Sequence, residues 1–392
     1  MLLNQFIQTR LQTETLCKPL NIEDYIPQSV DFASPPKWHL AHVTWFFEEM
    51  ILTKYLENYQ VFDESFSFLF NSYYQTIGER AKRAERGLIT RPTVEQVHEY
   101  RRYVDKHMQL LLSKELEQEA QESSQNFPDS LRELVVLGIN HEQQHQELLI
   151  TDLKYTFSLN PTFPVYSLQA NYLSDQNSKN GWVSMESGLY DIGHDGNGFC
   201  FDNELGFHQV HLADYQISQA LVTNREFIEF IDAGGYQQFD YWLDEGWTWV
   251  CENQINHPLY WQKKDDKWFY YTLTGLQAVD LDAVLAHVSF YEANAYATWK
   301  EMRLPTEFEW EVASNQFDWG SRWEWTASAY QAYPNFSIRK GAVGEYNGKF
   351  MVNQMVLRGA SRATAKGHSR HTYRNFFHPH FQWQFSGIRL AK

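Results

Sequence analysis

Cysteine is scarce in this chain of 392 residues. The three that occur, Cys17, Cys200 and Cys251, lie far apart in the sequence. So few and so scattered cysteines exclude a disulfide framework and a cage of thiolates around a metal. Their scarcity is typical of a reducing compartment, and we expect the protein to be cytoplasmic.

Long apolar runs are missing as well. The N-terminal stretch MLLNQFIQTRLQTETL places polar residues among its apolar ones every few positions. No later stretch is apolar for long enough to cross a bilayer. We therefore expect neither membrane insertion nor export.

Positive charge is in deficit, with 33 Lys and Arg against 49 Asp and Glu and a formal net charge of −16. A surface of that sign repels phosphate backbones and anionic lipid, so nucleic-acid binding is excluded as the main function. Aromatic residues are instead abundant, at 16% of the chain. Buried indole and phenol groups need polar partners, and this composition is typical of a protein with aromatic-lined pockets.

The length of the chain favours two domains, because a single hydrophobic core rarely grows this large. Residues 1–158 are poor in glycine and show helical spacing, which predicts a helical domain. Residues 159–190 lack sustained periodicity and predict a connection. Residues 191–392 are rich in Gly, Trp, Asn and short strand-like segments. We therefore predict an α+β protein of two domains.

Three helices are predicted in the first domain. Ser34 followed by two prolines is a helix-start signal for residues 36–56. Residues 94–112 form a second amphipathic segment, and residues 131–155 form a third. These elements favour a four-helix bundle, a scaffold that often holds a metal site between facing helices.

The motif His141-Glu142-Gln143-Gln144-His145 places two imidazoles one turn apart on one helical face. It matches HExxH, the pattern of zinc hydrolases in which Glu142 is the general base. The surrounding amides are unlike the apolar flanks of that motif. The alternative without a metal is a pair of hydrogen-bonded core histidines.

A third histidine in WHLAHVTWFF raises the case for a metal site. Imidazole ligands suit iron, copper, nickel and zinc alike. Helical periodicity does not decide between His39 and His42, since each shares a stripe with aromatic or apolar neighbours.

Several segments together resemble the ergothioneine-biosynthetic sulfoxide synthases, also called hercynine oxygenases. In the first half these segments are WHLAHVTWFFEE, FNSYYQTIGERAKRAERG and INHEQQHQELL. In the second half they are FCFDNE, VTNREFIEFIDAGGY, RLPTEFEWE, WEWTAS, VLRGAS and YRNFFHPHFQWQFSGIRLA. The resemblance implies a DinB-like four-helix bundle followed by a domain similar to formylglycine-generating enzymes, which is a variant of the C-type-lectin fold.

The same resemblance implies an Fe(II)- and O2-dependent enzyme that joins a cysteine-type thiol to C2 of the hercynine imidazole and leaves a sulfoxide. Its iron ligands would be His42, His141 and His145, and His39 would be structural. Glu142 would then have no catalytic role and would hydrogen-bond a liganding imidazole.

The resemblance also implies contacts to hercynine, the betaine of histidine. Gln144 would donate a hydrogen bond to its imidazole. Asn375 would bond its carboxylate, and the Phe376 ring would face its trimethylammonium group. A core position is the plain alternative for Phe376.

Tyrosines in FNSYY occupy the place of active-site phenols in the subgroup that this chain resembles. A proton from Tyr73 or Tyr74 would direct the oxidation towards C–S coupling and away from a sulfinate. Tyr346 is the candidate for the arrangement in which the second domain supplies the phenol.

For the thiol, the resemblance implies that Arg83 and Arg86 clamp the donor carboxylate, although a solvated charged segment explains them equally. Relatives that use γ-glutamylcysteine carry an acidic residue where this chain has Phe377. The phenyl ring cannot pair with the glutamyl ammonium group, so we predict that cysteine is preferred over γ-glutamylcysteine.

Four alternatives remain at this point. A selenosugar-using synthase or a histidine-using ovothiol-type synthase would keep the three histidines and change the substrate pocket. A zinc hydrolase would need Glu142 as its base, and a ligand-binding protein would leave the histidines without a metal. Formylglycine-generating activity is not expected, because its copper-binding cysteine pair lies late in the domain and no cysteine follows Cys251.

Overall fold

The computed structural model describes residues 2–72, 81–121, 129–337 and 347–392. The chain divides into two compact units, Met1–Leu159 and Asn160–Lys392. No helix within the described ranges is long and apolar enough to cross a membrane.

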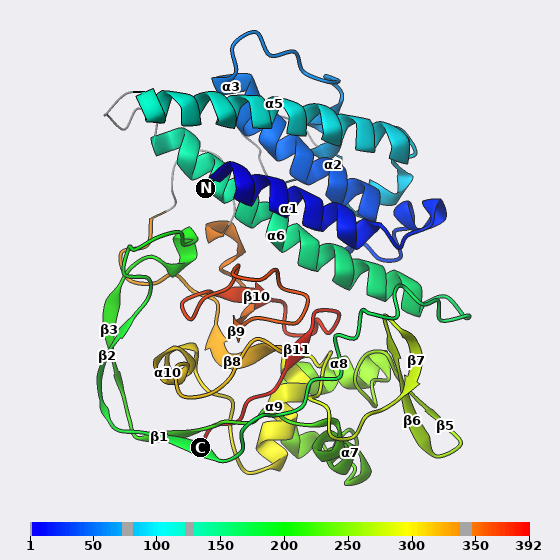
Figure 1. Cartoon of the computed structure of the whole chain (residues 1–392). Helices are drawn as coiled ribbons and strands as arrows, with labels where there is room; N and C mark the ends of the chain where they lie inside the picture. The colour runs from blue at the N-terminus through cyan, green and yellow to red at the C-terminus, as the bar shows by residue number, and fades with distance from the viewer. Residues whose placement is uncertain (1, 73–80, 122–128, 338–346) are drawn as a thin grey trace. The chain divides into compact units, whose positions relative to one another are not determined.

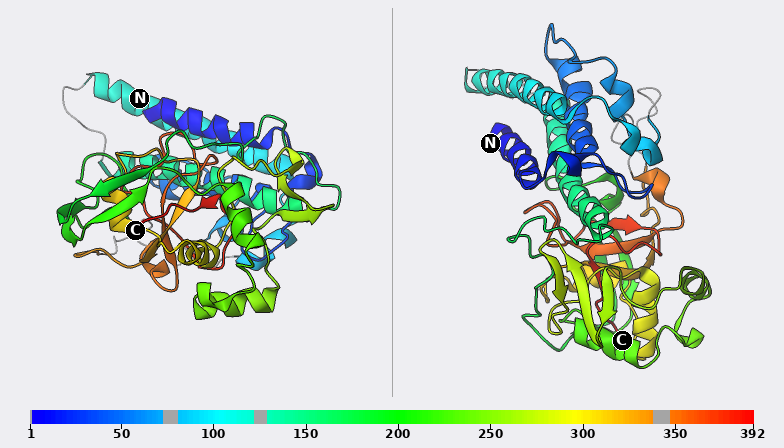
Figure 2. Two further views of the ribbon diagram at one scale, coloured as in Figure 1. Left: turned by 90° about the horizontal axis from the view of Figure 1, so that it is seen from below. Right: turned by 90° about the vertical axis from the view of Figure 1, so that its right-hand side faces the viewer.

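The first unit is built on four long helices that lie side by side, as Figures 1 and 2 show. They are α1 (Leu2–Cys17), α2 (Pro36–Phe47), α5 (Val94–Gln121) and α6 (Asp129–Ser158). Helix α2 packs against both α5 and α6, and α1 packs against α6. The shorter helices of the unit are η1 (Ile22–Tyr25), α3 (Thr53–Tyr55), α4 (Phe66–Phe70) and η3 (Arg83–Leu88). The expected helical bundle is confirmed.

Helix α2 begins directly after Ser34 and Pro35, as the helix-start signal predicts. It is not one regular helix to residue 56, however, because a π-helical segment, η2 (Glu48–Leu52), separates it from α3. The buried Glu48 carboxylate accepts hydrogen bonds from the hydroxyls of Tyr59 and Tyr100, at 2.6 and 2.5 Å. Tyr59 follows Glu48 by 11 residues and Tyr100 follows it by 52, and both hydroxyls hold the widened turn in place.

Within its described residues, the second unit combines short strands with four α-helices. The helices are α7 (Asn224–Asp232), α8 (Asp244–Asn253), α9 (Phe290–Trp299) and α10 (Glu307–Ala313). Short 3-10 turns are η4 (Asp202–Glu204), η5 (Phe239–Tyr241) and η7 (Gly348–Phe350). The strands are β1 (Trp182–Met185), β2 (Gly188–Ile192), β3 (His208–Leu212), β4 (Tyr215–Ser218), β5 (Trp261–Lys264), β6 (Lys267–Thr272), β7 (Gly275–Ala278), β8 (Trp323–Ala329), β9 (Met355–Gly359), β10 (Asn375–Phe377) and β11 (Ser386–Gly387).

These strands form four small sheets. The largest has the order β10-β9-β8-β11, in which β11 is parallel to β8 and the other pairs are antiparallel. Strands β5, β6 and β7 form an antiparallel meander, and β1-β4 and β2-β3 are two-stranded. The mixture of helices and short strands confirms the α+β class.

Three helices of the second unit start with a capping box, the pattern in which a Ser or Thr caps the helix and a Glu three residues later bonds back. Thr223, Ser289 and Thr306 each accept a hydrogen bond from the backbone N–H of that glutamate. Two of these boxes lie in the segments VTNREFIEF and RLPTEFEWE. Those segments therefore have a structural role in starting α7 and α10.

Buried ion pairs stabilise the largest sheet of the second unit, which contains β8 and β10. Arg374 binds both carboxylate oxygens of Glu307, at 2.8 and 2.9 Å. Arg389 binds both oxygens of Glu324, at 2.6 and 2.8 Å. Bidentate geometry fixes orientation as well as charge, so these pairs position β8 and the residue just before β10.

Candidate metal centre

Helices α2 and α6 bring three histidines together. His42 comes from α2, and His141 and His145 come from α6. All three are buried, and one ligand nitrogen from each lies within 4.8 Å of the others. Among the described residues this is the one group of His, Cys, Asp and Glu side chains with the geometry to hold a metal ion.

The orientation of His42 is set by a main-chain carbonyl. Its Nδ1 lies 2.6 Å from the carbonyl oxygen of Phe70, at the end of α4. A carbonyl only accepts, so Nδ1 of His42 carries the hydrogen and Nε2 carries the lone pair. This Nε2 lies 3.2 Å from Nε2 of His141.

Aromatic rings stack on His42. The indole of Trp38 lies nearly parallel to the imidazole at 14°, with ring centroids 4.4 Å apart. Trp45 is also nearly parallel, at a centroid distance of 5.7 Å. The guanidinium carbon of Arg86 lies 3.3 Å from the centroid of the Trp38 ring. The Trp38 indole therefore contacts both a buried cation and the His42 imidazole.

Burial keeps the three imidazoles neutral. Loss of hydration lowers the pKa of His141 to about 4 and places the pKa values of His42 and His145 well below the usual histidine range. The neighbouring imidazoles lower the pKa values of His42 and His145 further. A neutral imidazole offers a lone pair, and the three residues therefore fit a divalent metal with open coordination positions.

His39 is not one of the three but touches them. Its Nδ1 lies 2.9 Å from Nδ1 of His145. Its Nε2 lies 3.1 Å from a carboxylate oxygen of Asp152, which is also buried. Periodicity left His39 and His42 equivalent, and the geometry separates them.

Glu142 has a different position from the one expected. Its fully buried carboxylate accepts hydrogen bonds from Arg10 at 2.8 Å, and from Thr13 and Arg101 at 2.6 Å each. Burial alone would raise its pKa, but the two arginines outweigh that effect and lower the pKa to about 2. The expectation that Glu142 bonds a liganding imidazole is thus corrected, because its carboxylate holds α6 to α1 and α5.

The same contacts remove the base of a zinc hydrolase. A general base must reach the proton that it abstracts, and Glu142 is enclosed by two guanidinium groups. Gln146, one turn after Glu142 on α6, also bonds to α1. Its amide donates to the Thr9 carbonyl and the Thr13 hydroxyl, at 2.9 and 3.0 Å. The polar flank of the motif therefore packs against α1.

The other residues predicted in the first unit are placed separately. Gln144 is half-buried on α6, directly before His145. Arg86 is buried and donates to the hydroxyls of Ser34 and Ser72, at 2.8 and 3.1 Å. Arg83 is exposed and donates to the Phe32 carbonyl. The carboxylate clamp stays a prediction.

The predicted proton donors lie outside the described residues. Tyr73 and Tyr74 belong to the segment 73–80, and Tyr346 belongs to the segment 338–346. Their roles stay predictions.

In the second unit, β10 carries the three residues predicted to face substrate. The Asn375 side-chain oxygen accepts from the backbone N–H of Phe376 at 2.9 Å, which leaves its amide N–H groups as donors. The Phe376 ring stacks on Tyr330 at 4.1 Å and 11°. The rings of Phe377 and Trp383 meet edge to face, with their centroids 4.9 Å apart. All three are half-buried.

Two participants were missed by sequence reasoning. Asp152 lies on the inward stripe of α6, two turns after His145, and this position in the sequence could have identified it. The Phe70 carbonyl is a backbone group, so the residue type at position 70 could not have predicted its role.

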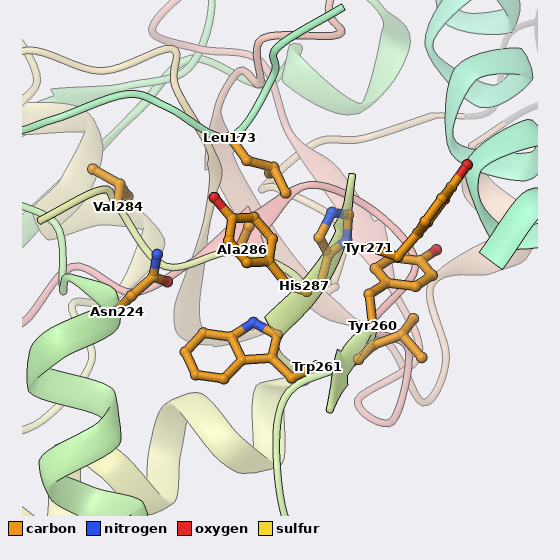
Figure 3. A pocket seen from close by; sticks show the side chains of 10 residues that line it. Leu173, Asn224, Tyr260, Trp261, Tyr271, Val284, Ala286 and His287 are labelled. Carbon is orange, nitrogen blue, oxygen red and sulfur yellow. The ribbon is translucent and has the colours of Figure 1, made fainter. Parts of the chain in front are cut away.

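A separate cavity in the second unit is lined mainly by aromatic and apolar side chains. In Figure 3 the rings of Tyr260, Trp261 and His287 surround it. Tyr260 and His287 have positive backbone φ angles of 73° and 63°, which residues other than glycine rarely adopt. It contains no cluster of metal-ligating side chains among the described residues.

Comparison with known families now defines the class. Residues 5–149 match the DinB superfamily, and residues 169–322 match the sulfatase-modifying factor enzyme 1-like domain. The chain thus joins a DinB-type helical domain to a domain of the formylglycine-generating enzyme type.

Curated relatives narrow this class. The chain is 29% identical over 311 residues to hercynine oxygenase of Mycolicibacterium smegmatis, covering 65% of this chain and 70% of the relative. It is 30% identical over 244 residues to hercynine oxygenase of Mycolicibacterium thermoresistibile, covering 49% and 54%. A formylglycine-generating enzyme of Thermomonospora curvata is 27% identical over 182 residues, covering 40% and 58%. The chain is related to the hercynine oxygenases, as its motifs predict.

Proposed function

We propose that this protein is an iron-dependent sulfoxide synthase that joins a cysteine-type thiol to C2 of the hercynine imidazole, using dioxygen. The observation that carries the proposal is the cluster of three buried, neutral histidines on α2 and α6. Its relatives, which include hercynine oxygenases of two Mycolicibacterium species, support the same chemistry.

The choice of iron follows from the donor set and the reaction. Three neutral nitrogen donors suit several divalent metals, but oxidation of a thiol by dioxygen needs a metal that changes its redox state. Bound Fe(II) would supply that activation of dioxygen. A zinc hydrolase is the weaker alternative, because Glu142 is held by Arg10 and Arg101.

The protein's own residues would bind and orient hercynine. We assign Gln144 as the donor to the imidazole ring and Asn375 as the donor to the betaine carboxylate. The bond from the Phe376 N–H to the Asn375 oxygen supports the second role, because it leaves the amide N–H groups to meet an anion. Phe376 would offer ring surface to the trimethylammonium group, although Tyr330 already stacks on it.

A phenol would hold the proton that decides the product. We assign it to Tyr73 or Tyr74, with Tyr346 as the alternative. Protonation during oxygen activation would favour coupling of sulfur to carbon over oxidation of the thiol alone.

Cysteine is the proposed thiol, with Arg83 and Arg86 as carboxylate partners. Phe377 offers an apolar edge where a longer donor would need a negative charge. The proposed partners are therefore small molecules, namely hercynine, cysteine or γ-glutamylcysteine, and dioxygen. We propose a cytoplasmic location and no nucleic-acid or membrane partner.

The deciding experiment is reconstitution with Fe(II) under anaerobic conditions, metal analysis, and then product analysis in air. Hercynine and cysteine should give the sulfoxide conjugate, and the zinc-loaded protein should give none. Parallel reactions with histidine or a selenosugar separate the related synthases. Stoichiometric iron without any conjugate from these substrates would contradict the proposal.

A further inference from the structure

We infer that Asp152 and His39 form a hydrogen-bonded relay that fixes the tautomer and orientation of His145, so that its Nε2 lone pair faces His42 and His141. The inference rests on the proposed metal site and is independent of the substrates. Both relay residues act through His145 and are positioning residues.

The relay starts at a group that can only accept. One carboxylate oxygen of Asp152 accepts from the backbone N–H of Ser34 at 2.8 Å. The same oxygen lies 3.1 Å from Nε2 of His39. An ionised carboxylate has no hydrogen to give, so Nε2 of His39 carries one. Asp152 is thereby tied both to the start of α2 and to a ring on α2.

The second step follows from the two nitrogens of a neutral imidazole. With its hydrogen on Nε2, His39 has a lone pair on Nδ1. Nδ1 of His145 lies 2.9 Å away and must therefore be the donor. The hydrogen of His145 is then on Nδ1, and its Nε2 is left as the ligand atom.

His42 reaches the same state by a different route. Its Nδ1–H donates a hydrogen bond to the Phe70 carbonyl at 2.6 Å, which also leaves Nε2 with the lone pair. The tautomer of His42 is thus fixed by a main-chain carbonyl, which no substitution removes. The tautomer of His145 is fixed by two side chains, His39 and Asp152, which can be changed one at a time.

Partners of this kind keep a ligand ring in its binding orientation, and their loss typically weakens metal binding by about 10–100-fold. We expect His39→Ala and Asp152→Ala to weaken Co(II) binding to the full chain within that range. Asp152→Asn should recover part of the affinity, because the amide oxygen still accepts from His39. In the His39→Ala background, Asp152→Asn should have no further effect, because the relay is already broken.

The matched control is His107→Ala on α5. That ring also donates a hydrogen bond from Nδ1 to a backbone carbonyl, that of Tyr103 at 2.8 Å, and is not part of the three-histidine group. Co(II) affinity should be unchanged in this variant. Competition with a chromophoric chelator, together with the visible Co(II) spectrum, reports affinity and ligand geometry.

A second readout needs no metal. Nitrogen-15 spectra of the histidine-labelled, metal-free chain distinguish the two tautomers, with the His145 signals assigned by their loss in His145→Gln. Wild type should show His145 with its hydrogen on Nδ1, and His39→Ala should show a mixture. Hydrogen on Nε2 in the wild type, or Co(II) affinity unchanged in both His39→Ala and Asp152→Ala, would overturn the relay. Failure of the wild type to bind Co(II) or Fe(II) would instead contradict the proposed function, and the nitrogen spectra would still decide the relay.

Discussion

At the scale of single residues, substitution of any of the three clustered histidines should reduce iron retention far more than substitution of the neighbouring His39. Replacing His42, His141 or His145 by Ala leaves two ligands, which hold Fe(II) too weakly for retention through desalting. His39→Ala keeps all three ligands and should lose affinity without losing the site. Iron content after anaerobic reconstitution measures the difference. Full occupancy in His141→Ala would refute the ligand assignment.

Glu142 should matter for stability. Glu142→Gln removes a buried charge and leaves Arg10 and Arg101 without their shared counter-ion. Breaking a buried pair in this way costs roughly 3–5 kcal/mol, so the free energy of unfolding should fall by about that amount. Chemical denaturation measures it, with exposed Glu133→Gln on the same helix as the control. Peptide hydrolysis by zinc-loaded wild type, lost in Glu142→Gln, would instead favour the protease alternative.

Phe377 allows a test of thiol choice. In the wild type we expect kcat/KM for cysteine to exceed that for γ-glutamylcysteine. Phe377→Asp supplies a partner for the glutamyl ammonium group and should shift the ratio towards γ-glutamylcysteine by about tenfold or more, since charge-assisted bonds are worth roughly 1.5–3 kcal/mol. Side-by-side kinetics with hercynine measure the ratio. A ratio unchanged by the substitution would show that another position selects the thiol.

At the scale of elements, the close approach of α2 and α6 depends on one glycine. A Cβ at Gly138 would lie 2.6 Å from a ring carbon of Phe47 and 3.0 Å from one of Phe46. Gly138→Ala should therefore push α6 away from α2, at a cost of about 1–3 kcal/mol. His141 follows Gly138 on α6, so Co(II) affinity should fall together with stability. Glu133→Ala, on an exposed position of α6, should change neither.

The sequence predicts elements better than their irregularities. A helix-start signal located α2, which is buried on every side, and helical periodicity located α5 and α6. The π-helical turn at Glu48 could not be predicted, since its partners Tyr59 and Tyr100 are brought there by the fold. For the site, HxxxH spacing identified His141 and His145, whereas the choice of His42 over His39 needed the family resemblance.

At the scale of the whole molecule, acid should destabilise the chain partly through His368. Burial, and then nearby Arg370, lower the pKa of this histidine from 6.5 to about 3. Between those values the unfolded chain binds a proton that the folded chain excludes, so stability falls as pH drops below 6.5. The contribution is about 1.4 kcal/mol per pH unit.

Denaturation curves measured from pH 7 to pH 4 test this effect. His368→Gln cannot titrate, so its stability should fall less steeply than that of the wild type. The rings of Tyr373 and Phe201 face His368, and neither gains or loses charge in that range. Identical slopes for the two proteins would contradict the assignment.

The stacking of Trp38 on His42 also has an optical consequence. Indole emission is quenched by a nearby ion with a partly filled d shell and is little affected by one whose d shell is full. With Trp38 at 4.4 Å and Trp45 at 5.7 Å from the His42 ring, Fe(II) or Co(II) at the centre should dim these two of the chain's 14 tryptophans, while Zn(II) should not. The emission of Trp38 and Trp45 would thus distinguish a redox-active metal from zinc at this centre without any added dye.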